Sequence, residues 1–265
     1  QKKDVMMQIY VCVKHVPDTA ATINIVGDTG YNDTACKFII NPYDEYAVEE
    51  AVQRVEKAGS GEVIVVTVGL EAAVSTMRAA MAMGAHRGIL VKVPGQFLDS
   101  TLTSLALKAA IEQDGDGTPD VIFTGKNAVD TEGFQTQYRL AAAMNLPIVS
   151  EVVNLEINNG QAVVEREIGG GTREVLEMKL PCIIGATKGL NEPRYPKFPD
   201  IMKAKKKEIK EIDFDQLGLD TSVDQTALRK REAVPERASA QGMQGSRRDQ
   251  VSELVRILRE NDKVL

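Results

Sequence analysis

The chain has 265 residues, of which 43% are hydrophobic and 26% are charged, a balance typical of a globular protein with one large domain. Its net charge of −6 argues against a nucleic-acid binder, and its two histidines and three widely spaced cysteines predict neither a metal centre nor a disulfide framework. No apolar run reaches the roughly 18 residues that span a bilayer, so we expect a soluble protein inside the cell.

Up to residue 153, short apolar runs alternate with helical patterns. Strands are predicted at 7–13, 63–68, 88–93, 120–124 and 148–153. Helices are predicted after Asp44, at 71–83, after Asp99 or Ser100, and in the segment that ends at Met144. Asp44 is predicted to cap the first of these helices, and Asp99 or Ser100 the third. A small hairpin is predicted before Cys36. This alternation predicts an α/β fold with a doubly wound, mainly parallel sheet and helices on both faces.

The second half of the chain changes character. The turn Asn158-Asn159-Gly160 predicts a β-hairpin between 155–157 and 161–168, and the runs at 173–178 and 181–184 either complete the sheet or form a small β layer beside it. Residues 188–199 hold three prolines and are predicted to be extended, and a basic run follows at 203–207.

We predict two domains. Residues 1–200 form an α/β nucleotide-binding domain with a recognition loop at about 187–200. Residues 201–265 form an extended C-terminal arm that ends in a helix at about 249–260. The arm is polar and poor in core residues, so we expect it to gain its order by packing on a partner chain.

The loop at 125–136 is the strongest candidate for a ligand site. It follows a predicted strand and leads into a helix, whose first turn offers unpaired N–H groups and the positive end of the helix dipole to a phosphate. Ligands of parallel sheets bind beyond the carboxyl ends of the strands, where the segments after Val13, Val68 and Thr124 also meet Asn41. The loop has neither the P-loop nor the G-x-G-x-x-G pattern, and an ordinary strand-to-helix turn is the alternative.

Several separated motifs, in one order, resemble the electron transfer flavoprotein β subunit. They are Val-Cys-Val-Lys-His-Val-Pro-Asp at 11–18, Asn-Pro-Tyr-Asp-Glu-Tyr-Ala-Val-Glu-Glu-Ala at 41–51, Glu-Arg-Glu-Ile at 165–168, Leu-Asn-Glu-Pro-Arg-Tyr at 190–195 and Ile-Met-Lys-Ala-Lys-Lys-Lys at 201–207. Between them, Gly-Lys at 125–126, Asp130 and Gln-Thr at 135–136 match the nucleotide loop of the family. The resemblance covers about residues 7–212.

The resemblance implies an electron carrier subunit that is not itself an enzyme. In this family the β subunit pairs with an α subunit that holds most of the FAD, and the β subunit binds AMP. The heterodimer takes electrons from acyl-CoA dehydrogenases, as in fatty acid oxidation, and passes them to a membrane quinone oxidoreductase. The implied location is the cytoplasm of a bacterium or the mitochondrial matrix of a eukaryote.

Carried over residue by residue, the resemblance implies two sets of site residues and no catalytic or metal-binding residue. The cofactor-binding set is Cys12, Asn41, Pro42, Tyr43, Asp44, Val68, Gly125, Lys126, Asn127, Ala128, Val129, Asp130, Thr131, Glu132, Gly133, Phe134, Gln135 and Thr136. The partner-binding set is Leu190, Asn191, Glu192, Pro193, Arg194 and Tyr195. Tyr43 matches an aromatic residue near the flavin, and Leu190 matches an exposed apolar anchor for the dehydrogenase.

Three alternatives remain open on the sequence. Thr131, Gly133 and Phe134 depart from the common loop pattern of the family, and a bifurcating member would hold a second FAD in place of AMP and use NADH. The missing Gly-Asp-Thr form favours AMP. A nucleotide-hydrolysing or adenylating enzyme would need a phosphate-activating motif that the sequence lacks, and a stress-type ATP-binding module would not explain the long arm.

Overall fold

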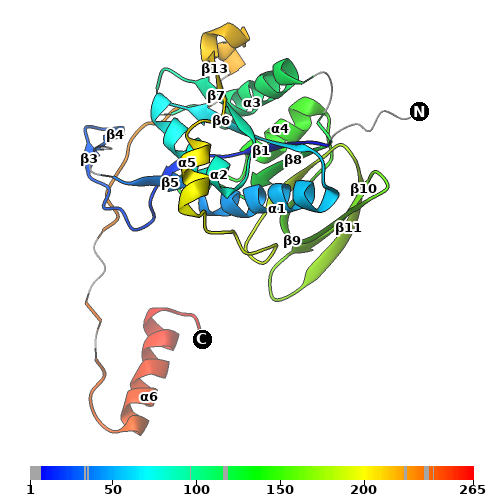
Figure 1. Cartoon of the computed structure of the whole chain (residues 1–265). Coiled ribbons are helices and arrows are strands. Elements are labelled where there is room, and N and C mark those ends of the chain that lie inside the picture. Colours follow the sequence, from blue (N-terminus) through cyan, green and yellow to red (C-terminus); the bar gives the residue numbers. More distant parts are fainter. Residues whose placement is uncertain are drawn as a thin grey trace. The chain divides into compact units, whose positions relative to one another are not determined.

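The computed structural model describes residues 7–32, 34, 36–95, 97–115, 119–223, 226–235, 239–240 and 242–265. The chain divides into two compact units, Gln1–Lys230 and Arg231–Leu265. The first unit holds a nine-stranded sheet with helices on both faces (Figure 1). The predicted domain boundary at residue 200 therefore falls inside the first unit.

The sheet is mixed and mainly parallel, as the sequence predicted. Its order is β11 (Arg173–Lys179), β10 (Gln161–Glu167), β9 (Ile148–Asn158), β12 (Cys182–Ala186), β8 (Val121–Gly125), β1 (Gln8–Cys12), β6 (Glu62–Gly69), β7 (Arg87–Lys92) and β13 (Ile209–Asp213). In this sheet order, every neighbouring pair from β9 through to β13 is parallel. Strand β10 pairs antiparallel with both β9 and β11. Two small antiparallel pairs, β2 (His15–Pro17) with β5 (Phe38–Ile40) and β3 (Ile25–Val26) with β4 (Gly30–Tyr31), lie outside this sheet.

Helices cover both faces because strand side chains alternate between two apolar clusters. The first cluster includes Ile9 and Val11 of β1 and the buried faces of α1 (Pro42–Ala58) and α2 (Val74–Met83), which follows the 3₁₀ turn η2 (Glu71–Ala73). The second includes Tyr10 of β1 and the buried faces of α3 (Ser100–Asp114) and α4 (Thr136–Met144). The doubly wound α/β architecture predicted from the sequence is confirmed.

Two details of the predicted strands differ. The runs at 148–153 and 155–157 are one strand, β9, which pairs with β12 on one side and with β10 on the other. The predicted hairpin is thus an extension of the central sheet. Strand β12 is fully buried between β9 and β8, so the later strands complete the sheet and form no separate layer.

The start of the arm is more ordered than predicted. Helix α5 (Phe198–Ala204) begins one residue before the third proline of the extended segment, and β13 adds an edge strand beside β7. The 3₁₀ turns η3 (Phe214–Leu217) and η4 (Thr221–Val223) follow. These elements are too short and too charged to give a period in the sequence, and β13 gains its backbone partners only from the folded sheet.

The second unit contains the predicted last helix. Helix α6 (Arg247–Arg256) begins with a capping box of Ser246 and Asp249, and the π-helical turn η5 (Ile257–Asn261) follows. Its apolar residues Val251, Leu254 and Val255 are exposed. No helix in the described part of the chain is both long and apolar enough to cross a membrane.

Asp99 is a strong N-cap, as predicted, and it makes one further contact. Its Oδ1 accepts hydrogen bonds from the backbone N–H of Thr101 at 2.5 Å and of Leu102 at 3.3 Å, and its Oδ2 accepts one from Thr226 Oγ1 at 2.7 Å. Asp99 therefore ties the start of α3 to a segment near the end of the first unit.

We expect Asp99→Ala to lower the free energy of unfolding by about 1–2 kcal/mol, because the first turn of α3 loses its acceptor. Asp99→Asn keeps a capping oxygen and is the matched control, with a smaller loss. Urea unfolding of the purified protein measures both. Equal stability of the two variants would contradict this role for the cap.

Candidate functional site

The candidate site lies at the carboxyl edge of the parallel strands. Three segments meet there: the chain after β1, the start of α1 and the loop after β8. The backbone N–H of Val13 donates to Val66 O at 2.9 Å, and that of Asn41 donates to Lys14 O at 3.0 Å. The predicted convergence of these segments is therefore observed.

Asp44 joins all three segments through one buried carboxylate. Its Oδ2 accepts from the backbone N–H of Lys14 at 2.7 Å, and its Oδ1 accepts from the backbone N–H of Gly125 at 3.0 Å and from Asn41 Nδ2 at 2.9 Å. The residue is only 5% exposed. Burial raises the pKa of Asp44 to about 7, against the lowering effect of these three donors.

The predicted helix cap at Asp44 is therefore wrong. Helix α1 begins at Pro42, and Asn41 is its N-cap residue, although the Asn41 side chain accepts no hydrogen bond from a backbone N–H of the first turn. Proline suits the first helical position because its missing N–H would have no helical partner there. Asp44 lies inside the first turn, so its carboxylate is free to reach the two neighbouring loops.

Asn41 also holds the loop after β8. Its Nδ2 donates to Asn127 O at 2.8 Å, and its Oδ1 accepts from the backbone N–H of Val129 at 3.0 Å. Both ends of one buried amide thus bond to the backbone of the candidate loop. Asn41 and Asp44 together fix residues 125–129 relative to α1.

The start of α1 lies so close to the end of β8 that position 125 must be glycine. A Cβ atom at this position would lie 2.3 Å from Asp44 Oδ1 and 2.8 Å from Tyr43 Cβ. Both distances are shorter than a van der Waals contact, so any side chain would push α1 away from the strand. The sequence motif Gly-Lys therefore has a packing reason at its first position.

Sequence reasoning missed a buried amide behind the loop. Gln137 accepts from Thr124 Oγ1 at 3.0 Å and donates to Lys126 O at 2.6 Å and Ser150 Oγ at 3.0 Å. These contacts connect β8, α4 and β9. The only sequence signal for this role is a polar residue on the face of α4 that carries Leu140 and Ala141.

The middle of the loop carries charge and backbone strain. Glu132 and Phe134 have φ angles of 47° and 54°, which cost side-chain-bearing residues of the order of 1 kcal/mol each. Lys126 Nζ lies 5.1 Å from the ring centroid of Tyr43 and 5.9 Å from that of Phe134. Asp130, predicted to cap the loop or bind a ribose, forms an ion pair with Lys14 at 2.8 Å.

The remaining predicted cofactor residues lie around the same edge. Cys12 ends β1 and Val68 lies near the end of β6, and both side chains pack against the second apolar cluster. Burial raises the pKa of the Cys12 thiol to about 12, so it is neutral near pH 7. Gln135 precedes α4 and accepts at Oε1 from Arg139 Nη2 at 2.8 Å, and Thr136 is the first residue of that helix.

One buried acceptor near the site has no partner. Asn127 Oδ1 is inaccessible to solvent and makes no hydrogen bond within the described residues. An unsatisfied buried oxygen costs about 1–3 kcal/mol.

The predicted anchor Leu190 is only partly exposed. It is half-buried and packs against the first apolar cluster, so part of its side chain is covered. The turn at Thr187, whose carbonyl accepts from the Leu190 N–H at 3.3 Å, directs the chain back over the core. The exposed apolar residues come later, at Tyr195 and Phe198, which are 96% and 73% exposed.

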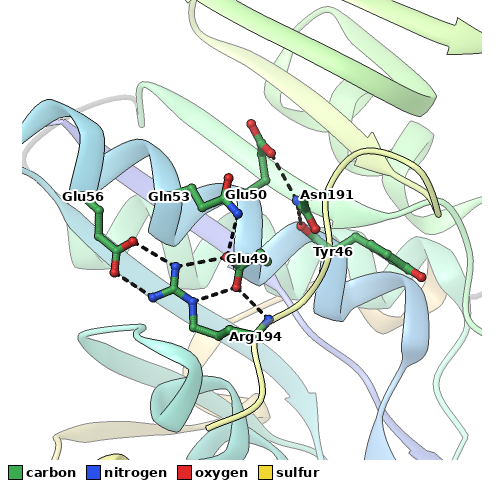
Figure 2. Close-up of polar contacts among 7 residues, drawn as sticks. All are labelled: Tyr46, Glu49, Glu50, Gln53, Glu56, Asn191 and Arg194. Atoms are coloured by element: carbon green, nitrogen blue, oxygen red, sulfur yellow. Dashed lines mark hydrogen bonds and ion pairs between the residues drawn. The ribbon is translucent and has the colours of Figure 1, made fainter.

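Some of the other residues of this segment bond to α1, and others are exposed to solvent. Asn191 and Arg194 bond to α1 (Figure 2). Glu192 is exposed, and Pro193 is half-buried between the two held residues.

Comparisons with known proteins establish the family of the chain. A sequence model of the electron transfer flavoprotein domain matches residues 29–217. The chain is 37% identical over 268 residues to the electron transfer flavoprotein subunit beta of Bacillus subtilis (strain 168), across 98% of this chain and 100% of that protein. The chain belongs to the electron transfer flavoprotein β-subunit family.

Other members of the electron transfer flavoprotein β-subunit family are similar to a comparable degree. The β subunit of Bradyrhizobium diazoefficiens is 36% identical over 260 residues, across 98% of this chain and 100% of that protein. The mouse β subunit is 38% identical over 223 residues, across 81% of this chain and 84% of that protein. As a member of this family, the chain serves electron transfer in a flavoprotein and acts as an electron carrier subunit rather than an enzyme.

We expect Gly125→Ala to destabilise the protein by about 1–3 kcal/mol, because the new methyl group overlaps Asp44 and Tyr43. Gly133→Ala is the matched control from the same loop. A Cβ atom there meets nothing within 4 Å, so its effect should stay within about 0.5 kcal/mol. Urea unfolding gives both values, and equal losses would contradict the packing role of Gly125.

Proposed function

We propose that the chain is the β subunit of an αβ electron transfer flavoprotein and holds AMP at the carboxyl edge of its sheet. In this proposal the chain also helps the α subunit to hold FAD. When bound, FAD accepts electrons from a donor protein and gives them to an acceptor. The chain's own residues bind and position; they supply no reacting group.

The observation that carries this proposal is the network of Asp44 and Asn41 around the loop after β8. It fixes the polar loop between a strand end and the start of α4 through hydrogen bonds of 2.7–3.0 Å. The start of α4, to which this loop leads, is suited to the phosphate of AMP, since its first N–H groups have no helical acceptors. Thr136 would add its hydroxyl group to this end of the site.

The unpaired Asn127 Oδ1 supports an organic ligand with a hydrogen-bond donor. A ribose hydroxyl group or the adenine amino group would satisfy it. The positive φ angles at Glu132 and Phe134 support the same view, because backbone strain of this kind concentrates at binding sites. The chain thus offers an acceptor and a helix start, and AMP has a matching donor and anion.

We further propose that the segment after Arg194 contacts an acyl-CoA dehydrogenase, with Phe198 rather than Leu190 as its apolar anchor. Phe198 is exposed and begins α5, and prolines at 193, 196 and 199 stiffen the chain around it. A large apolar side chain on a stiff segment loses little conformational entropy when it docks. Electrons would then pass from the heterodimer to a membrane quinone oxidoreductase.

The second unit is proposed to pack on the α subunit. Helix α6 exposes Val251, Leu254 and Val255 along one face, although a helix of this length is marginal in isolation. Cover from the partner chain would bury this face. The proposed location is the bacterial cytoplasm, or the mitochondrial matrix if the source is a eukaryote.

The ligand content of the αβ complex tests the nucleotide proposal. Acid release followed by chromatography should give about one FAD and one AMP per heterodimer. Asn127→Ala should lower the AMP content while the FAD content stays unchanged, because only the acceptor at the proposed AMP site is lost. Asn154→Ala, on an exposed part of β9, is the control.

Two other results would change the assignment. Two FAD molecules per heterodimer would indicate the bifurcating form that uses NADH. Turnover of ATP by the chain alone would contradict both forms.

The docking proposal is tested by a pair of variants of the αβ complex. Phe198→Ala should raise, by about tenfold, the carrier concentration that half-saturates an acyl-CoA dehydrogenase reduced with octanoyl-CoA, because it removes the anchor. Leu190→Ala should instead lower stability by about 1–2 kcal/mol and leave the docking kinetics unchanged, since Leu190 packs against the core. The reverse pattern would restore Leu190 as the anchor.

A further inference from the structure

Arg194 is held by two carboxylates of α1 (Figure 2). Its Nε donates to Glu49 Oε2 at 2.8 Å and its Nη2 to Glu49 Oε1 at 3.0 Å. On the other side, Nη1 donates to Glu56 Oε1 at 2.7 Å and Nη2 to Glu56 Oε2 at 2.9 Å. The guanidinium group therefore forms a two-point contact with each carboxylate, which fixes its orientation as well as its position.

The backbone of the same residue is held too. The Arg194 N–H donates to Glu49 Oε2 at 3.1 Å, so Glu49 bonds to both the main chain and the side chain of one residue. Three residues earlier, Asn191 Nδ2 donates to Tyr46 O at 3.0 Å and to Glu50 Oε2 at 3.1 Å. The segment is thus attached to α1 at two points along its length.

The partners on α1 form one stripe. Tyr46, Glu49, Glu50 and Glu56 follow helical spacing along one side of the helix, and Gln53 supports Glu49 through a hydrogen bond of 2.7 Å. The opposite side of α1 is fixed independently, because Ala47, Val48 and Ala51 are fully buried in the first apolar cluster. The helix therefore does not need the segment in order to stay in place.

Because Glu49 is buried, its carboxylate depends on the ion pair with Arg194. The Glu49 side chain is 3% exposed, and a buried carboxylate without a cation is costly. Burial raises the pKa of Glu49, but the hydrogen bonds from Arg194 and Gln53 outweigh it and hold the pKa below its usual value. The carboxylate thus stays ionised near pH 7 and available to Arg194. Glu56 lies closer to the solvent and completes the second side of the contact.

The residue directly after this contact is the exposed Tyr195, and Phe198 follows three positions later. Arg194 is therefore the last residue of the segment that bonds to α1 before the exposed apolar residues. A segment held in this way has little conformational entropy left to lose when a partner binds.

We propose that Arg194 is a positioning residue, which with Glu49 and Glu56 fixes the start of the segment from Tyr195 to Phe198 on α1 in the conformation that docks. The inference rests on the proposed docking function. It adds that the affinity for the partner depends on a residue that need not touch the partner.

The test uses the αβ complex with its flavin and an acyl-CoA dehydrogenase reduced with octanoyl-CoA. For Arg194→Gln we expect the half-saturating concentration to rise by about tenfold, while the maximal rate stays within about twofold and the FAD content is unchanged. Arg194→Lys keeps the charge but not the two-sided geometry, so it should recover part of the affinity.

Arg87 supplies a matched control for simple loss of stability. Like Arg194, it bridges two carboxylates, Glu62 at 3.0 Å and Asp114 at 2.7 Å, but it lies at the start of β7, away from the docking segment. Arg87→Gln should lower the melting temperature and leave the half-saturating concentration unchanged. If Arg194→Gln behaves in the same way, Arg194 is only structural and the proposal is overturned.

The Phe198→Ala variant separates this inference from the function on which it rests. A raised half-saturating concentration in Phe198→Ala with a normal value in Arg194→Gln overturns the positioning role alone. Normal values in both variants overturn the docking function as well. Raised values in both, with Arg87→Gln normal, support the positioning role. Faster amide hydrogen exchange of residues 195–198 in Arg194→Gln would add direct support that the contact orders the segment.

Discussion

The carboxylate of Asp44 is the constraint on which the candidate site depends. It accepts hydrogen bonds from Lys14, Asn41 and Gly125, which belong to the segment after β1, the start of α1 and the end of β8. These segments are far apart in the sequence, and no other single side chain near the site bonds to all of them within the described residues. Because the group is buried, loss of any of these donors leaves its oxygens less fully hydrogen-bonded, so the three segments are held as a unit.

Helix α1, which carries Asp44, also contacts other parts of the first unit. Its first turn holds the loop after β8, its middle holds Asn191 and Arg194, and its apolar side packs on the sheet. One rigid element of 17 residues therefore positions both the proposed nucleotide edge and the proposed docking segment. In a carrier, such rigidity is useful, since the distance between a docked partner and a cofactor controls electron transfer.

The sequence predicted the parts of the fold that depend on local pattern. The alternation of apolar runs and helical periods located β1, β6, β7, β8 and their helices, and it implied that their carboxyl ends share an edge. It did not predict β13, because a five-residue strand with three charged residues has no pattern of its own and forms only beside β7. It also split β9 in two, since a strand with different partners along its length changes its pattern of buried positions.

The site was predicted less completely than the fold, for a related reason. Motifs identified Asn41, Asp44 and the loop, but the role of Asp44 as a three-way acceptor depends on distances that only the fold sets. Leu190 was named as an exposed anchor, but its side chain is partly covered by the first apolar cluster, which only the fold shows. Arg194 was named as a contact residue, but its partners Glu49 and Glu56 lie about 140 positions away in the sequence.

The most direct test of the account is a crystal structure of the αβ complex. The account predicts density for AMP at the carboxyl edge of the sheet, with a donor of the nucleotide bonded to Asn127 Oδ1 and the phosphate at the start of α4. Water or protein atoms at both positions, with the nucleotide bound elsewhere, would contradict it.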